Sequence, residues 1–473
     1  MTTRRAFIGS AAAGAAALPL GSWAAKSSSP NMTFGVIGAP ESCRFENWAD
    51  NLEKAFRYFK TKSVDAVVIA GDITKSGLIE EMERFSSVWN KVFSGGGGKG
   101  GSKVELLLVT GDHDIVGWSG RWANFTKEQQ EIVRFAHGDN PKNVWQRLFR
   151  KEWEPIWRKE IKGYTFIGMH WPCPNMPPIK EYLLKREAEL KGGKPFFLIS
   201  HMLPRNTYRG NVGNEEMAKV LQRFPNAVVL TGGPDHPSLL DELCVWQGMY
   251  TTIRAGCLNE ALFGVEYENM APTWHPAYKK HVMEPDRSIV SHGGGVELVQ
   301  VYDDHLTVYR MHTEGGCKQA LGAPWTVPLP AKVGGDGDLG VRKSRRRAPQ
   351  FNAGARLDVT FCPSGHPSLG PSFKDQSCYC VTIPRAKTVK VQRTGEACRV
   401  FDYVVTASAE DAAPIVRRIV AAGATLPESM ANTPSKCLFL AKELPEKKAL
   451  RFSVVPRDSF GLEGKPITKT FSP

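Results

Sequence analysis

The first half of the sequence alternates short, β-branched apolar runs with longer amphipathic stretches. One stretch, at residues 47–61, repeats large apolar side chains every three or four positions, as a helix with one buried face does. Alternation of this kind is typical of βαβ units, in which helices cover a sheet. The strand-like runs lie at residues 33–38, 66–70, 104–110, 164–170, 195–200 and 226–231. The pattern predicts an α/β fold with its chemistry at the carboxyl ends of the strands.

The pattern changes past residue 232, where helical periodicity fades and strand-like runs dominate. A linker, Gly-rich and then basic, interrupts these runs before a last region of short strand patterns. We therefore expect an α/β domain over residues 32–330, a linker over residues 331–352 and a β-rich module over residues 353–473. Within that module, residues 410–422 are expected to form a helix.

Composition limits the class of protein. Of the 473 residues, 42% are hydrophobic and 23% are charged, which excludes a largely disordered chain. The net charge of +13 is partly local, because Arg4, Arg5 and a basic run at residues 342–347 contribute to it. Such a run is typical of a solvated tether, and polyanion binding is the less favoured interpretation. We expect no nucleic-acid partner, and a nucleic-acid binder is the least favoured function.

The amino terminus resembles a twin-arginine export signal. Arg4 and Arg5 are followed by Phe7 and Ile8, a mildly apolar Ala- and Gly-rich stretch and then small residues. We expect residues 1–25 to be a cleaved signal peptide and the mature chain to be periplasmic or extracellular; an anchor that is never removed is the alternative. No later stretch approaches the roughly 18 apolar residues of a membrane span, so the mature chain is expected to lack a transmembrane segment.

Several strand-like runs end in residues that can bind a metal or transfer a proton. They are Asp72 in Gly71-Asp72, the segment Gly111-Asp112-His113-Asp114, then His201, and the segment Gly232-Gly233-Pro234-Asp235-His236. Taken singly, a Gly-Asp pair is an ordinary turn, and a lone histidine such as His201 or His170 is usually satisfied by hydrogen bonds. Their joint placement at successive strand ends predicts one shared site.

The order and spacing of these segments resemble the calcineurin-like metallophosphoesterase family, which includes purple acid phosphatases and cyclic-nucleotide phosphodiesterases. That family shows Asp-x-His, Gly-Asp, Gly-Asn-His-Asp/Glu, a lone His and Gly-His-x-His. Here the successive intervals are 33 residues from Ala39 to Asp72, 40 to Asp112, 89 to His201 and 32 to Gly233. The resemblance implies an α/β/β/α sandwich with a two-metal site. The last strand patterns resemble fibronectin-type sandwiches, which implies a fibronectin-like C-terminal β-sandwich.

The sequence departs from the family pattern at both ends of the motif set. Ala39-Pro40-Glu41 stands where the family has Asp-x-His, Asp112 replaces Asn, and Gly233-Pro234-Asp235 replaces His-x-His. The resemblance implies metal ligands at Glu41, Asp72, Asp112, His201 and Asp235. Ala39 and Gly233 cannot supply a side-chain ligand, and His236 is a possible substitute for the second of them.

The remaining ligand set is rich in carboxylates. These suit hard cations such as Mg²⁺, Mn²⁺ or Ca²⁺ better than zinc, so we expect one or two divalent metal ions, with iron and zinc as further candidates. Without a cation the clustered carboxylates would repel one another, unless a basic neighbour compensated them. Lys75, just past Gly71-Asp72, is the candidate for that neighbour, although a solvated loop lysine is the favoured interpretation.

These expectations combine into a function. We expect an exported, metal-dependent phosphoesterase-like hydrolase that acts on a phosphate ester through metal-activated water, with His113 as the general acid held by Asp114. Phosphomonoesters, phosphodiesters and nucleotides all remain open as substrates. The alternative is a catalytically inactive relative that serves as an envelope binding protein, because two ligand positions are lost.

Overall fold

The structure is a computed structural model of the whole chain. The predicted signal peptide and Asp235 lie outside the residues that it describes. Within the described part, no helix combines the length and the apolar character needed to cross a membrane. The described residues are 29–117, 125–172, 176–209, 213–233, 236–261, 271–275, 280–284, 294–366, 375–391, 397–431 and 433–472.

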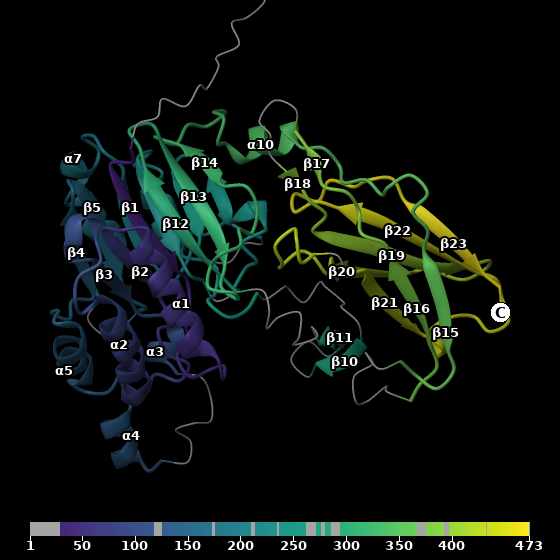
Figure 1. The fold of residues 1–473 in the computed structure, drawn as a ribbon, viewed down its shortest axis with the longest axis horizontal. Coiled ribbons are helices and arrows are strands. Elements are labelled where there is room, and N and C mark those ends of the chain that lie inside the picture. The colour runs from purple at the N-terminus through teal and green to yellow at the C-terminus, as the bar shows by residue number, and fades with distance from the viewer. Residues whose placement is uncertain are drawn as a thin grey trace, which may run out of the picture.

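Two six-stranded sheets form the centre of the first domain (Figure 1). In the first sheet β1, β2 and β3 run parallel, and β12 pairs antiparallel with β1. Its order is β14 (Trp325–Pro328), β13 (His305–His312), β12 (Gly295–Val301), β1 (Met32–Ile37), β2 (Ala66–Ala70) and β3 (Glu105–Val109).

The second sheet is also mixed, with a longer parallel centre. Four of its strands, β5, β6, β7 and β9, run parallel, and an antiparallel strand closes each edge. Its order is β4 (Ile156–Ile161), β5 (Tyr164–Met169), β6 (Phe196–Ser200), β7 (Ala227–Thr231), β9 (Thr251–Arg254) and β8 (Val245–Gln247).

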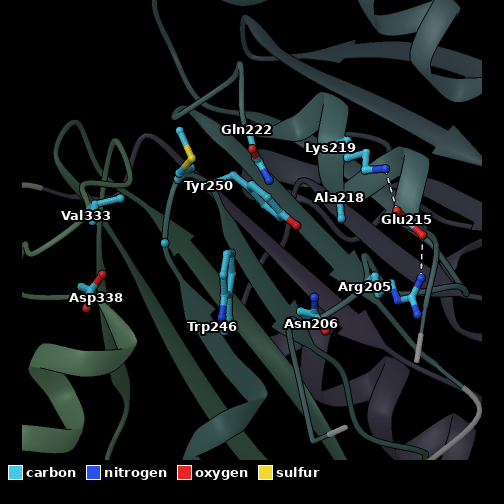
Figure 2. A pocket seen from close by; sticks show the side chains of 12 residues that line it. Arg205, Asn206, Glu215, Ala218, Lys219, Gln222, Trp246, Tyr250, Val333 and Asp338 are labelled. Atoms are coloured by element: carbon cyan, nitrogen blue, oxygen red, sulfur yellow. Dashed lines mark hydrogen bonds and ion pairs between the residues drawn. The ribbon is translucent and has the colours of Figure 1, made fainter. Parts of the chain in front are cut away.

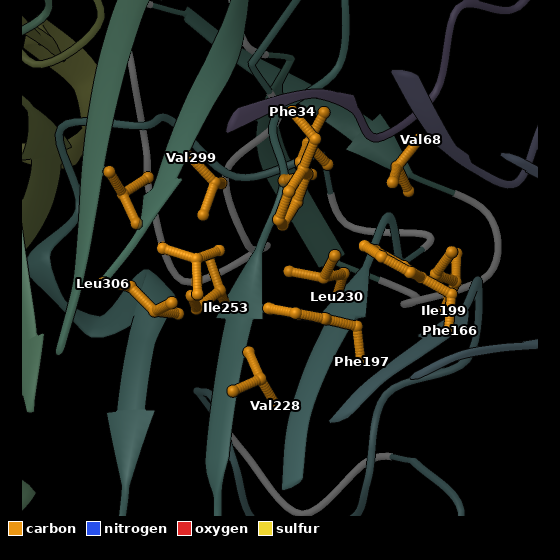
Figure 3. Close-up of a cluster of buried hydrophobic side chains, with 14 of the residues drawn as sticks. Phe34, Val68, Phe166, Phe197, Ile199, Val228, Leu230, Ile253, Val299 and Leu306 are labelled. Atoms are coloured by element: carbon orange, nitrogen blue, oxygen red, sulfur yellow. The ribbon is translucent and has the colours of Figure 1, made fainter. Parts of the chain in front are cut away.

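The two sheets pack face to face. Alternate residues of β1 and β2, such as Phe34 and Val68, point toward Phe166 and Phe197 of the second sheet (Figure 3). The rings of Phe34 and Phe197 meet edge to face with centroids 5.1 Å apart. This apolar layer holds the two sheets, and the strand ends that they carry, in one position.

Helices cover the outer faces. On the first sheet lie α1 (Trp48–Thr61) and α2 (Ile79–Phe93). On the second lie α6 (Ile179–Leu184), α7 (Glu187–Leu190) and α8 (Glu215–Leu221). The arrangement confirms the predicted α/β fold with its two sheets between helical layers. Shorter elements are η1 (Lys99–Gly101), α3 (Asp112–Ile115), α4 (Lys127–Val133), α5 (Asn140–Val144), η2 (Trp145–Phe149), η3 (Glu242–Cys244), β10 (Ala271–His275) and β11 (Lys280–Glu284).

The C-terminal part is built from strands. The sheets β15-β16-β21 and β20-β19-β22-β23 share one apolar core, to which Val381, Val405 and Phe439 belong. The expected helix at residues 410–422 is wrong, because residues 415–420 pair with β19 as a strand. The fibronectin-like topology stays a prediction. The elements are β15 (Asp358–Cys362), β16 (Cys378–Ile383), β17 (Val389–Lys390), β18 (Ala397–Cys398), β19 (Asp402–Ala409), β20 (Ile415–Val420), β21 (Ser435–Leu440), η4 (Ala441–Glu443), β22 (Leu450–Arg457) and β23 (Ile467–Phe471).

The basic segment between the two parts is docked rather than solvated. It forms helix α10 (Leu339–Arg345), which Figure 1 shows between β14 and β17. Arg342 is buried and donates to the carbonyl oxygens of Val245 and Glu242, and Arg346 is buried against Asp458 at 2.9 Å. The expectation of a solvated tether is therefore wrong for these two arginines, because each finds a buried acceptor far away in the sequence.

Candidate metal centre

Candidate site residues occupy unusual backbone conformations. Asp72, two residues after β2, has φ +46°, Glu41 has φ +42° and His236 has φ +36°. Non-glycine residues rarely adopt positive φ, and such conformations concentrate at functional sites, where surrounding structure holds them. Gly71, at φ +102°, has no room for a side chain, because a Cβ there would lie 2.3 Å from Nδ1 of His201. The chain at the end of β2 is thus shaped around His201.

Asp72, Asp112 and His201 converge, as predicted, from the ends of three strands. Nε2 of His201 lies 3.2 Å from Oδ2 of Asp72 and 3.2 Å from Oδ1 of Asp112. Asp72 and His201 are fully buried, whereas about a third of the Asp112 side chain (32%) is exposed. The cluster therefore has one open side, at Asp112.

The hydrogen bonds around this cluster leave its ligand atoms available. Nδ1 of His201 lies 3.0 Å from the carbonyl oxygen of Ala70, so it is the protonated nitrogen of the neutral ring. That leaves the lone pair of Nε2 directed at two carboxylates, and neither Nε2 nor Oδ1 of Asp112 has a hydrogen-bond partner within the described residues. A carbonyl that orients a histidine in this way is typical of metal ligands. The donor set fits a divalent cation.

The charges of Asp72 and His201 also favour a cation at this site. Burial alone would raise the pKa of Asp72 and lower that of His201, but their mutual attraction outweighs burial and shifts both in the opposite directions. The pair thus favours a positive charge between its members. A proton on His201 or a metal ion can supply that charge.

Asp114 does not hold His113. Its carboxylate accepts hydrogen bonds from the backbone N–H groups of Ile73, Thr74 and Gly111, and from the Thr74 hydroxyl. The expectation that Asp114 orients the His113 imidazole is therefore wrong, because both oxygens are used to brace the loop after β2. Asp114 contributes to the site by fixing the backbone that carries Asp72.

His113 faces Glu41 instead. Its Nδ1 lies 3.4 Å from Oε1 of Glu41, and its backbone N–H donates to Oδ1 of Asp72 at 3.1 Å. Glu41 is completely buried. The imidazole is thus positioned between the loop after β1 and the candidate ligand Asp72.

Arg44 is the basic residue that the sequence analysis missed. Its Nη1 lies 2.5 Å and 2.6 Å from the two oxygens of Glu41 and 2.9 Å from Oε1 of Glu260. Lys75 was the predicted compensating group, and no ion pair involves it among the described residues. The spacing of three residues from Glu41 to Arg44 was visible in the sequence, but it carries no signal for a shared buried site.

His236 lies with Glu41 and Glu260 rather than with Asp72, Asp112 and His201. Its Nδ1 lies 2.7 Å from Oε1 of Glu260, in a buried group with Glu41 and Cys257. The expectation that His236 replaces the ligand lost at Gly233 is wrong, because His236 joins Glu41 instead of Asp112. Cys257, which the sequence analysis did not single out, donates from Sγ to the carbonyl oxygen of Ala39 at 3.1 Å.

The guanidinium of Arg254 lies beside Gly233. This arginine is fully buried, its guanidinium lies over the ring of Tyr208 at 4.4 Å, and its Nη2 is 2.1 Å from the place where a Cβ on Gly233 would begin. Gly233 has φ +57°. At position 233 the structure thus has a glycine packed against a buried guanidinium and no room for a ligand side chain.

His170 lies in the core rather than in a cleft. Its ring stacks on Trp153 at 4.1 Å and contacts Trp145 edge to face, and Nδ1 accepts a hydrogen bond from the backbone N–H of Thr110. The Thr110 N–H and the two tryptophan rings hold His170, while its Nε2 has no hydrogen-bond partner within the described residues.

A separate cavity of about 480 Å³ lies beside α8 and β8 (Figure 2). Trp246 and Tyr250 supply its apolar wall, and Glu215 bridges Lys219 and Arg205 at its polar side. None of its described lining residues belongs to one of the candidate metal-ligand groups. We therefore assign the chemistry to the strand ends and not to this cavity.

The sequence profile of calcineurin-like phosphoesterases matches residues 46–237, a span that includes Asp72, Asp112, His113 and His201. Residues 46–237 belong to a calcineurin-like phosphoesterase domain. Domains of this family use divalent metals and act on phosphate esters, which agrees with the donor set at Asp72, Asp112 and His201. The calcineurin-like match begins after Glu41 and Arg44, so it does not include the loop that carries them. No curated protein sequence matches the chain.

Several solved structures are similar to the chain. A dimetal phosphatase from Danio rerio is 11% identical, with 63% of this chain and 99% of that chain covered and a TM-score of 0.38. GAP50, described as the anchor in the inner membrane complex of Plasmodium, is 11% identical, with 64% of this chain and 89% of that chain covered and a TM-score of 0.34. Purple acid phosphatase PPD1 from yellow lupin is 13% identical, with 61% of this chain and 53% of that chain covered and a TM-score of 0.39. Likenesses of this strength say nothing about the calcineurin-like domain's own chemistry.

Proposed function

We propose that the protein is an exported, metal-dependent hydrolase of phosphate esters. The observation that carries the proposal is the convergence of Asp72, Asp112 and His201, with the unpartnered Nε2 of His201 directed at both carboxylates. Ligand atoms held in this way before a metal binds cost little reorganisation when it does. The open side at Asp112 is where a substrate would approach.

In this proposal each residue has one task. Asp72, Asp112 and His201 would hold a divalent cation, which polarises a phosphoryl group and lowers the pKa of a bound water. His113 would transfer a proton to the leaving oxygen, a step typically worth 10²–10⁴-fold. Glu41 lies 3.4 Å from Nδ1 of His113, so Nε2, on the other side of the ring, would carry that proton.

The test pairs metal analysis of the purified protein with hydrolysis of aryl phosphate monoesters and diesters. We expect Asp112→Ala to lose both bound metal and activity. We expect His113→Ala to keep the metal and lose roughly 10²-fold or more in kcat. Asp139→Ala and His137→Ala are matched controls on exposed positions and should leave both readouts unchanged. A protein without metal, whose rate none of these changes affects, would contradict the proposal.

Export rests on the amino-terminal Arg4-Arg5-Ala6-Phe7-Ile8 segment. Because the twin-arginine route carries folded chains, the protein could acquire its metal before crossing the membrane. Replacing both Arg4 and Arg5 by Lys should leave the chain in the cytoplasm in a cell fractionation experiment. Export of the double variant at the wild-type level would rule out this route.

A binding protein is the second candidate function. It is favoured by Ala39 and Gly233, which put no ligand where the family has histidine or aspartate. Bound metal, together with aryl phosphate hydrolysis that is no faster than in His113→Ala, would favour this alternative over the hydrolase.

A further inference from the structure

We propose that the guanidinium of Arg44 stands in for one of the two metal ions, so that the site holds a single divalent cation between Asp72, Asp112 and His201. This inference rests on the proposed function and concerns the same site. The relevant group is Glu41, His236, Cys257 and Glu260, whose ligand atoms lie within 4.8 Å of one another.

The two carboxylates of that group already share a counter-charge. Glu41 and Glu260 are 0% and 2% exposed, and a buried carboxylate needs a counter-charge. Nη1 of Arg44 lies within 2.6 Å of both Glu41 oxygens and 2.9 Å from Oε1 of Glu260. A single side chain therefore bridges the two acids as a cation would.

The other two donors are also committed. Sγ of Cys257 donates its proton to the carbonyl oxygen of Ala39, so it is a thiol and not the thiolate that binds metals. Nδ1 of His236 is 2.7 Å from the Glu260 oxygen that Arg44 also contacts. Ala39 itself offers no side-chain ligand. A second metal at this position would compete with Arg44 for both carboxylates, and Cys257 could bind it only after losing its proton.

The backbone explains how Arg44 reaches this position. Glu41 and Cys43 have φ +42° and +71°, and the N–H of Arg44 donates to the carbonyl oxygen of Glu41 at 3.0 Å. This tight turn folds the arginine back over the carboxylate three residues before it. The turn is tied to the site on its other side, because the N–H of Glu41 donates to the carbonyl oxygen of Asp72.

The Asp72, Asp112 and His201 group differs in each of these respects. Oδ1 of Asp112 and Nε2 of His201 have no hydrogen-bond partner within the described residues, and no arginine or lysine forms an ion pair with either aspartate there. A guanidinium supplies permanent positive charge and hydrogen-bond donors, but it offers no coordination position for water. The two halves of the site are therefore expected to differ in metal binding.

The test counts Mn²⁺ ions per chain by mass spectrometry after saturation and removal of excess metal, with the electron paramagnetic resonance spectrum as a second readout. We expect one equivalent and the signal of an isolated Mn²⁺ ion. Two equivalents with exchange coupling would overturn the inference and leave the proposed function standing. No bound Mn²⁺ would overturn both.

Variants test the role of Arg44 directly. Arg44→Ala removes the built-in charge and should bind a second equivalent of Mn²⁺, whereas Arg44→Lys should remain at one. An Arg44→Ala protein that folds and still binds only one equivalent would overturn the inference. If Arg44→Ala does not fold, Glu260→Gln is measured in its place. The inference requires the Glu260→Gln protein to bind one equivalent of Mn²⁺ per chain. Loss of that equivalent would refute the inference. Asp112→Ala, the matched control, should bind none.

Discussion

The guanidinium of Arg254 occupies the space that a Cβ on Gly233 would need. A Cβ on Gly233 would meet Nη2 of Arg254 at 2.1 Å, and the arginine has no room to retreat because it is fully buried over Tyr208. We expect Gly233→Ala to lose about 2 kcal/mol or more of unfolding free energy, since overpacking adds to the strain of an alanine at φ +57°. Urea unfolding measures the loss.

The control for this prediction is Gly138→Ala. Gly138 has φ +52° but no atom within 4 Å of the place where its Cβ would be. It therefore carries the same backbone strain without the clash. Equal losses for the two variants would show that Arg254 does not press on Gly233.

Breaking the ion pair of Arg346 and Asp458 should destabilise the junction between the two parts of the chain. Both side chains are buried, at 2% and 0% exposure, so Asp458→Asn leaves a buried guanidinium without its hydrogen-bonded carboxylate and with Glu242 as the remaining acid that acts on it. We expect a loss of about 3–5 kcal/mol in unfolding free energy. Asp336→Asn removes the partner of the nearby, more exposed Arg345 and should cost less than about 1 kcal/mol. Comparable losses would contradict the buried docking of Arg346.

Glu297 in β12 should make the protein less stable as the pH rises. Burial raises its pKa to about 8, and Arg310 only partly opposes this shift. The folded chain then retains a proton that the unfolded chain releases above its ordinary pKa, so unfolding free energy falls between about pH 5 and pH 8. Glu297→Gln should flatten this slope in urea unfolding, whereas Glu131→Gln, at an exposed position, should not. An unchanged slope in Glu297→Gln would refute the assignment.

His170 should remain neutral in mild acid. Burial lowers its pKa to about 3, and its Nδ1 already accepts a hydrogen bond from the N–H of Thr110. In the folded protein its ring resonances should not titrate between pH 7 and pH 4, whereas in urea they should titrate near the ordinary value of about 6.5. Because only the unfolded chain takes up this proton, His170 lowers stability as the pH falls below about 6.5. Titration near 6.5 in the folded state would place His170 in water.

The sequence was most informative where local pattern and chemistry coincide. Alternating strand and helix periodicity predicted the α/β fold, and the spacing of polar strand ends predicted that Asp72, Asp112 and His201 meet. These predictions succeed because the carboxyl ends of parallel strands lie at a common edge, whatever the intervening loops do.

The predictions fail where a contact depends on residues far away in the chain or on an unusual turn. The partner of Arg346 lies 112 residues away, so a basic run looked solvated. Arg44 reaches Glu41 through a turn with positive φ at two non-glycine residues, which no periodicity encodes. Residues 415–420 became a strand because Ile and Val pair with β19 and Pro414 opposes a helix.

Loops of the C-terminal part also contact the segment that carries His236. The hydroxyl of Ser238 donates to the carbonyl oxygen of Ala424, and the backbone N–H of Glu242 donates to the hydroxyl of Ser459. The C-terminal part therefore holds the segment after His236 in place from outside the α/β domain. The calcineurin-like part expressed without the C-terminal strands would keep Asp72, Asp112 and His201 but lose the contacts that hold the segment after His236.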